Sequence, residues 1–239
     1  MTTKIAVLTD VHANLPALQA ALRDLEQEGY DRLIHTGDAI GIGPFPAETL
    51  ETLLAVPNIS FIMGNHDAWF AQGLPDLQAA SYLPSWFPAH LQWTLAALNP
   101  DLRPVLAQWP YLLQENIEGV KITFLHYALD LSGRDFVTPV FEPTPATLDR
   151  LFADYDSDLI FYGHHHPFSD LQGRAHYINP GSLGCYTKAV ARYALVLLEN
   201  GQATIEHRSI PYDQSPLFQA YELRQVPGRE TIYREIFGK

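Results

Sequence analysis

Three short apolar runs alternate with two helix-like segments over the first 63 residues, and this order constrains the fold more than any other feature. Ile5 to Thr9, Arg32 to His35 and Ile59 to Met63 have the length and composition of buried strands. Between them, leucines at helical spacing follow Asn14, a typical N-cap residue, and a second helix is expected from Ala47 to Ala55. Strand, helix, strand, helix, strand implies parallel pairing through right-handed crossovers.

The second half of the chain reads as richer in antiparallel strands. Strands are expected at 111–117, 120–125 and 159–162, with a helix at 144–154 and hairpins at 168–178 and 193–210 around Gln172-Gly173 and Asn200-Gly201. Residues 1–239 are therefore expected to form one α/β domain of two stacked mixed sheets with outer helices.

Two segments stand apart from this strand pattern. Residues 68–109 contain no clear strand and hold all four tryptophans. We interpret them as a helical insertion, with helices at 90–98 and 101–108, that lies over the sheet and can act as a lid. Residues 211–239 form a C-terminal tail of two amphipathic pieces separated by Pro227-Gly228.

Charge and composition exclude several classes of function. The formal net charge is −12, with only 15 lysines and arginines in 239 residues. This argues against a surface that follows nucleic-acid phosphates or adheres to anionic lipid. A single cysteine, Cys185, excludes an intrachain disulfide and a cysteine-rich zinc site. The apolar run before Asp10 is too short for a signal peptide, and no run of about 18 apolar residues exists, so a cytoplasmic location is expected.

Candidate metal ligands follow the ends of five predicted strands. They are Asp10 and His12, Asp38, Asn65 with His66 beside it, His126, and His164 with His166. In α/β sheets the carboxyl edge of the strands is where ligands bind. Each motif alone has an ordinary structural explanation, such as a turn, a hydrogen-bonded loop histidine or a solvated histidine run. Five motifs that share this placement favour a metal site.

The donor set indicates the chemistry. Residues 10–12 are expected to present two ligands on the same side of an extended segment, and His164 and His166, at the same spacing, can reach one ion or two. Carboxylate and imidazole without thiolate suit Mn, Fe, Zn, Co or Ni at a catalytic site. Asp38, in a Gly-Asp turn, is suited to bridge two ions, because a carboxylate has two oxygens. Two ions about 3.5–4 Å apart can position both oxygens of an in-line phosphoryl displacement. The remaining histidines fit no motif and are expected to be structural or surface residues: His35, His90, His165, His176 and His207.

Taken in order, these motifs resemble the signature of the calcineurin-like metallophosphoesterases. The pattern D-x-H, G-D, G-N-H-[DE], a lone His and G-H-x-H occurs at residues 10–12, 37–38, 64–67, 126 and 163–166. The chain is similar to the compact bacterial and archaeal phosphodiesterase branch. Its residues 37–44 resemble a G-D-x-V-G-Y-G-P block, and residues 178–184 contain N-P-G-S-x-G. The resemblance covers nearly the whole chain and implies a four-layer α/β/β/α sandwich.

The resemblance also implies a role for each residue. The first metal ion would be held by Asp10, His12 and His166, and the second by Asn65, His126 and His164, with Asp38 as the bridge. A metal-bridging hydroxide would attack phosphorus, and His66 would stabilise the transition state and protonate the leaving oxygen. Two divalent transition-metal ions are implied, with manganese as the first choice.

The chain departs from the family pattern at two places. Protein Ser/Thr phosphatases carry Asp-Arg-Gly after the G-D turn, whereas Gly41-Ile42-Gly43 stands here, which disfavours a protein phosphatase. Close relatives often have His-Gly-Ser-Pro where this chain has residues 126–129, His-Tyr-Ala-Leu. The ligand is kept, but the substrate contacts of that loop differ. Asp67 matches the motif and is interpreted as a residue that orients the turn.

Aromatic and basic residues near the motifs are candidates for substrate contacts. Aromatic side chains gather just after His66: Trp69, Phe70, Tyr82, Trp86, Phe87 and Trp93. They can stack a nucleobase, although packing of the insertion helices is the favoured explanation. Arg134 and Arg192 are candidate phosphate contacts on loops, and a plain surface role is favoured for each.

The sequence thus supports two hypotheses of different classes. The first is a dinuclear metal-dependent phosphoesterase that hydrolyses a small phosphodiester or phosphomonoester, nucleotide-derived ones included. The second is a non-catalytic metal-binding scaffold or regulatory protein of the same fold. Retention of all the implied ligands and of His66 favours the enzyme. A third reading makes one of the two ions purely structural. The expected partner is a small-molecule phosphoester, with no membrane and no nucleic-acid polymer, and the insertion and tail can either close a homo-oligomer or cover the core.

Overall fold

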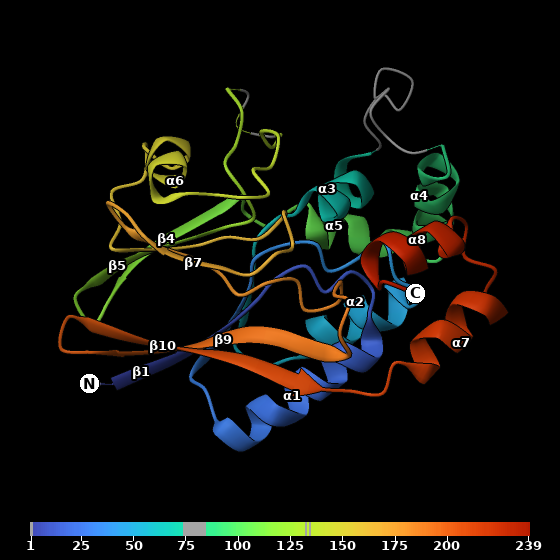
Figure 1. The fold of residues 1–239 in the computed structure, drawn as a ribbon, viewed down its shortest axis with the longest axis horizontal. Coiled ribbons are helices and arrows are strands. Elements are labelled where there is room, and N and C mark those ends of the chain that lie inside the picture. Colours follow the sequence, from blue (N-terminus) through green and yellow to red (C-terminus); the bar gives the residue numbers. More distant parts are fainter. Residues whose placement is uncertain (1, 74–84, 132, 134) are drawn as a thin grey trace.

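Two five-stranded mixed sheets stack at the centre of the protein (Figure 1). A computed structural model describes residues 2–73, 85–131, 133 and 135–239. The strands of the first sheet, in spatial order, are β10 (Gln202–Pro211), β9 (Val190–Glu199), β1 (Thr2–Leu8), β2 (Arg32–His35) and β3 (Ile59–Phe61). Those of the second are β4 (Leu112–Ile117), β5 (Val120–Leu125), β6 (Leu159–Phe161), β8 (His176–Asn179) and β7 (Ser169–Gln172). The pairs β1–β2 and β2–β3 confirm the predicted parallel pairing.

Helices complete the outer layers. They are α1 (Leu15–Glu28), α2 (Pro46–Leu54), α3 (Asn65–Gln72), α4 (Phe87–Ala96), α5 (Arg103–Leu106), α6 (Pro145–Leu151), α7 (Ser215–Leu223) and α8 (Arg229–Ile236), with a 3-10 turn at Pro100–Leu102. Figure 1 shows α1 under the first sheet and α6 over the second. The predicted four-layer α/β/β/α architecture is confirmed.

Apolar side chains fill the space between the layers. Ile5 and Val7 of β1 meet Ile122 and Phe124 of β5 between the two sheets. Because side chains alternate along a strand, Ala6 and Leu8 face the other way and pack with α1 and α2. This double burial explains why β1 reads as a continuous apolar run rather than an alternating one.

Local signals place most element ends within a few residues of their predicted positions. The Asn14 side chain accepts a hydrogen bond from the Ala17 N–H at 3.2 Å and caps α1, as predicted. The predicted helix at 101–108 is wrong as a continuous element. Its place is taken by the 3-10 turn and the short α5, because Pro104 lacks the N–H that a helix starting at Asp101 would need there.

The insertion and the tail both pack on the body of the chain. Phe70 of α3 and Leu106 of α5 join the core on the outer face of the first sheet. The tail covers the loop after β2, where the Tyr221 hydroxyl donates to the Ile42 carbonyl at 3.2 Å. Residues 74–84, which include Tyr82, lie outside the described residues, and so does the candidate phosphate contact Arg134. A lid function for 68–109 stays a prediction. Among the described helices, none is long and apolar enough to cross a membrane.

Candidate metal centre

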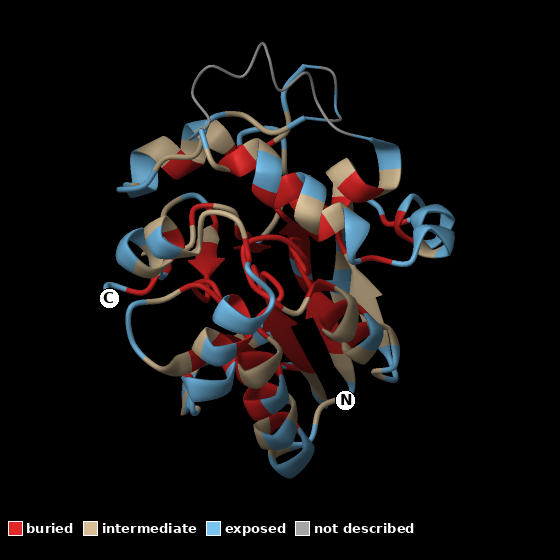
Figure 2. Cartoon of the chain, turned by 90° about the vertical axis from the view of Figure 1, so that its right-hand side faces the viewer, coloured by how far each residue is buried: buried red, intermediate tan, exposed pale blue. Residues whose placement is uncertain are grey.

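All five ligand motifs meet at one end of the stacked sheets. The loops after β1, β2 and β3 come from the first sheet, and those after β5 and β6 from the second. Figure 2 looks onto this end and shows buried loops at the centre, surrounded by helices with exposed outer faces. The predicted strand-end placement holds, but two sheets share the ligands rather than the edge of one.

The ligand loops use a backbone conformation that the sequence did not predict. Asp10 and His12 have φ of +51° and +47°, and Asp38, His164 and His166 also have positive φ. L-residues rarely adopt this left-handed region, and it concentrates at functional sites. The expectation of an extended segment at residues 10–12 is therefore wrong. The two side chains converge through a tight left-handed turn instead.

A first donor cluster combines residues from the loops after β1 and β6. His12 Nε2 and His166 Nε2 lie 2.9 Å apart, and Asp10 Oδ1 is 3.7 Å from each of them. Asp38 Oδ2 lies 3.7 Å from His12 Nε2. Four donor atoms from three separate loops thus surround one small volume.

A second donor cluster lies on the other side of Asp38. His126 Nε2 is 3.2 Å from Asn65 Oδ1, 3.2 Å from His164 Nδ1 and 3.3 Å from Asp38 Oδ2. Asp38 belongs to both clusters. The spacing of His164 and His166 did not decide whether they reach one ion or two. In the structure they point to different clusters.

Backbone carbonyls orient the histidines of both clusters. His12 Nδ1 donates to the Ile40 carbonyl at 3.2 Å, and His126 Nδ1 donates to the Thr36 carbonyl at 2.9 Å. A ring that donates through Nδ1 carries its free lone pair on Nε2, the atom that faces the cluster. This arrangement is typical of metal-binding imidazoles.

The electrostatics of the centre call for added positive charge. Asp10 and Asp38 are buried, and among the described residues neither pairs with Lys or Arg. Burial raises the pKa of Asp10 and lowers the pKa of His12 well below its ordinary value, so that ring is neutral. Burial also lowers the pKa of His164, to about 3. Buried carboxylates beside neutral imidazoles suit divalent cations, which supply the missing charge.

The second cluster contains one histidine whose pKa is raised rather than lowered. Burial alone would lower the pKa of His126, but the charge and hydrogen bond of Asp38 outweigh it and raise the pKa to about 9. Burial raises the pKa of Asp38. The positive charges of His126 and His66 outweigh burial, so the pKa of Asp38 is lowered overall.

His66, the predicted general acid, lies beside both clusters. Its ring is 5.0 Å from the His12 ring and 4.6 Å from the Trp69 ring. It is 7% exposed, and within the part of the chain that the structure describes its buried Nδ1 has no hydrogen-bond partner. Burial lowers the pKa of His66, and the Asp38 charge opposes this. The ring is thus held by packing rather than by a hydrogen bond at Nδ1.

Asp67 connects two of the ligand loops. Its carboxylate accepts the N–H groups of Asp38 at 2.7 Å, Ala39 at 3.1 Å and Gly64 at 3.3 Å. Burial, followed by the negative charge of Asp38, raises the pKa of Asp67 to about 7. This bonding accords with the prediction that Asp67 orients the turn, which here is the first turn of α3.

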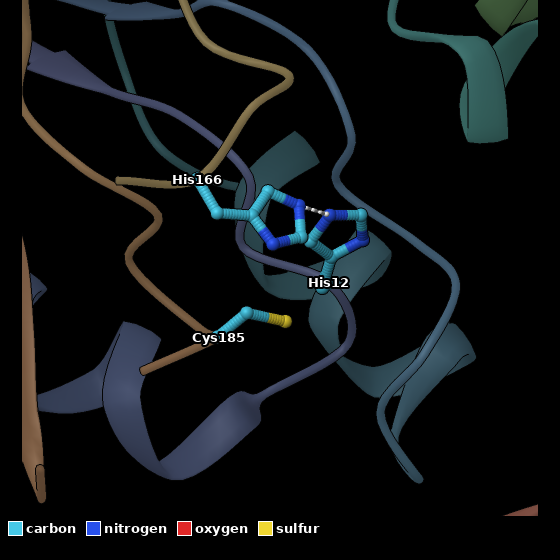
Figure 3. Close-up of side chains that lie close together, drawn as sticks. All are labelled: His12, His166 and Cys185. Carbon is cyan, nitrogen blue, oxygen red and sulfur yellow. Dashed lines mark hydrogen bonds between the residues drawn. The ribbon is translucent and has the colours of Figure 1, made fainter. Parts of the chain in front are cut away.

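Two residues near the centre escaped the motif analysis. Cys185 lies with His12 and His166 in a group whose donor atoms are all within 4.8 Å of one another (Figure 3). Arg192 is on β9 and 6% exposed, so the expected loop and surface role is wrong. Its guanidinium stacks 3.8 Å over Tyr186 and donates to the Ser182 and His166 carbonyls, at 3.2 and 3.1 Å. No local sequence pattern signals either placement, since both depend on long-range packing.

A cavity of about 600 Å³ opens from the second cluster. It is lined by Asn65, His66, Trp69, Phe87, Asp135, Phe136, Val137, Thr138, Pro139 and His164. A second cavity, of about 380 Å³, lies beside His166 and is lined by Cys185, Tyr186 and Arg192 among others.

The aromatic residues of the insertion divide between the cavity and the interior. Trp69 and Phe87 line the larger cavity. Phe70 is core, while Trp86 and Trp93 pack against the tail. Packing therefore explains Phe70, Trp86 and Trp93, but not the cavity faces of Trp69 and Phe87.

Comparison with known proteins agrees with this fold. Residues 3–201 match the calcineurin-like phosphoesterase superfamily domain, so the chain belongs to this family of metal-dependent phosphoester hydrolases. The uncharacterized protein MJ0912 of Methanocaldococcus jannaschii is 26% identical over an aligned length of 245 residues, gaps included. The alignment covers 93% of each chain.

Two solved structures share the whole fold. The hypothetical protein PH1004 from Pyrococcus horikoshii matches with a TM-score of 0.82 at 21% identity, over 99% of this chain and 98% of that one. A metallophosphoesterase from Sphaerobacter thermophilus matches with a TM-score of 0.72 at 23% identity, over 96% of each chain.

Proposed function

We propose that this protein is a dinuclear metal-dependent phosphoesterase that hydrolyses a small phosphodiester or phosphomonoester. The observation that carries the proposal is the pair of donor clusters that share Asp38, with His66 directly beside them. One cluster would hold the first ion and the other the second, with manganese as the first choice. When bound, such ions activate water and neutralise charge on phosphorus.

The chain itself would supply the proton for the leaving group. His66 borders the cavity and packs against Trp69 and Phe87. From there it would donate a proton to the leaving oxygen as the bond to phosphorus breaks. A positioned acid contributes about 10²–10⁴-fold to such a step. The apolar side chains around the ring exclude water and keep it oriented toward substrate.

Hydrolysis of a chromogenic phosphodiester and a phosphomonoester, after metal stripping and re-addition of Mn²⁺, tests the proposal. Activity should return with the metal, and the preferred ester should identify the diesterase or monoesterase preference. His66→Ala should lower kcat for an alkyl ester by at least about 10²-fold. The loss should be smaller for a p-nitrophenyl ester, because p-nitrophenolate leaves without protonation.

His207→Ala provides the matched control, because this histidine lies on β10 and bonds Asp170 rather than the centre. It should hydrolyse both esters like the wild type. Two bound metal ions without cleavage of either ester, or of a wider nucleotide panel, would instead support the non-catalytic scaffold.

A further inference from the structure

The cavity beside His66 has two aromatic walls from distant parts of the chain. Trp69 of α3 and Phe87 of α4 form one wall, with ring centroids 5.7 Å apart. Phe136, Val137 and Pro139, from the loop after β5, form another. Figure 1 shows these two segments as neighbours above the sheets. Such a volume and lining are typical of a site for a small organic group.

These walls touch the proposed catalytic groups directly. The Trp69 ring lies 4.6 Å from the His66 ring, and the Phe136 ring stacks on His164 at 5.7 Å. Phe136 also meets the His126 ring edge-on at 5.2 Å. A phosphate held at the two clusters would therefore place its leaving group between the aromatic residues, next to the acid that protonates it.

The charged side chains that line the cavity indicate which kind of leaving group it can bind. No Lys or Arg is among its described lining residues, and the one acidic lining residue is Asp135. A second phosphate would meet repulsion there, whereas ring N–H and amino groups would find acceptors in Asp135 and the Thr138 hydroxyl. Flat aromatic walls with hydrogen-bond acceptors fit a heteroaromatic base better than an aliphatic chain.

We infer that the cavity binds the base of a nucleoside leaving group, with Trp69, Phe87 and Phe136 as the residues that determine specificity. This inference rests on the proposed function and narrows its substrate class to phosphoesters of nucleosides.

Binding of nucleosides tests the inference without any hydrolysis. Equilibrium dialysis measures binding of adenosine, of guanosine and, as a control, of ribose. The metal-free protein and the Mn²⁺-loaded protein should each bind at least one of the nucleosides and not ribose. Trp69→Leu and Phe136→Leu should each weaken that binding by about tenfold, the effect expected of one lost stacking partner. Phe141→Leu removes an aromatic residue that is 64% exposed and outside the cavity, so it should bind like the wild type.

Kinetics then connect the cavity to turnover. In the 5′-(methyl phosphate) of adenosine or guanosine and in its counterpart without the base, the leaving oxygen is the sugar 5′-oxygen, so the two leaving alcohols differ only in the base. The nucleoside ester should have a kcat/KM at least about tenfold higher, and this ratio should fall in Trp69→Leu. Equal kcat/KM values for the two esters, or equal affinity for nucleosides and ribose, would overturn the inference and leave the proposed function intact. Nucleoside binding without hydrolysis of any ester would overturn the proposed function and leave the cavity as a nucleoside-binding site without a leaving-group role.

Discussion

Gly41 is the residue that most directly limits where the His66 ring can lie. It has φ of +86°, and a Cβ built on it would lie 2.1 Å from His66 Nδ1. Only glycine leaves room for the ring at this distance and also adopts this φ without strain. The loop after β2, which lacks the Asp-Arg-Gly of protein phosphatases, thus requires glycine at position 41.

Gly41→Ala should therefore displace the His66 ring and lower kcat by about 10²-fold, the usual cost of moving a catalytic group by about 1 Å. Metal content should stay at the wild-type level, because the three atoms nearest to the added Cβ all belong to His66 and none to a proposed metal ligand. Gly29→Ala is the control. Gly29 also has positive φ, +68°, but a Cβ there meets nothing within 4 Å. Equal losses of kcat in the two variants would point to backbone strain rather than to His66.

At the scale of elements, Asp67 holds the first turn of α3 against the loop after β2. Three N–H groups share its two oxygens. An asparagine side chain at this position would have only one oxygen and would place its own NH₂ against an N–H. Asp67→Asn should weaken metal binding by about 10–100-fold, as loss of a residue that supports metal ligands commonly does. Competition with a chromogenic chelator would measure this affinity.

Asp158→Asn is the matched control for that variant. The Asp158 carboxylate also accepts a backbone N–H, that of Lys121 at 2.8 Å, at the start of β5 and outside the two clusters. Its metal affinity should equal that of the wild type. If Asp67→Asn binds metal as tightly as Asp158→Asn does, Asp67 supports the fold and does not contribute to metal binding.

The elements were more predictable than the geometry that they support. Apolar runs that end at Thr9, His35 and Leu125 can be read locally, so the sequence predicts which loops carry ligands. The left-handed turns at Asp10 and His164 cannot be read in this way. Those residue types do not demand positive φ, and only the surrounding packing imposes it. Phe136 and Cys185 reach the site through contacts between segments far apart in the sequence, which no local pattern records.

For the molecule as a whole, Asp170 ties the two sheets together. From β7 its carboxylate accepts His176 Nε2–H of the same sheet at 2.5 Å and His207 Nε2–H of β10 in the other sheet at 2.6 Å. Partial burial raises the pKa of Asp170, but the hydrogen bonds from His176 and His207 outweigh it and lower the pKa overall. The ionised carboxylate is thus the form that the folded state favours.

Asp170→Asn should lower the free energy of unfolding by up to about 1 kcal/mol at neutral pH, a modest value because the group is partly solvated. A depressed folded-state pKa gives stability that is present above the ordinary aspartate pKa near 4 and lost as pH falls through the folded value. Urea denaturation of both proteins from pH 7 down to pH 3 should show the difference shrinking below about pH 4. A difference that is independent of pH would contradict this account.

The central claim is that two ions, shared through Asp38, make the hydrolytic site. Titration of Mn²⁺ into metal-free protein, with bound metal and phosphoester hydrolysis measured on the same samples, tests it most directly. We predict two ions per chain, with hydrolysis that rises as the second ion binds and is lost in Asp38→Asn. Full hydrolysis with a single bound ion, or in Asp38→Asn, would contradict the claim.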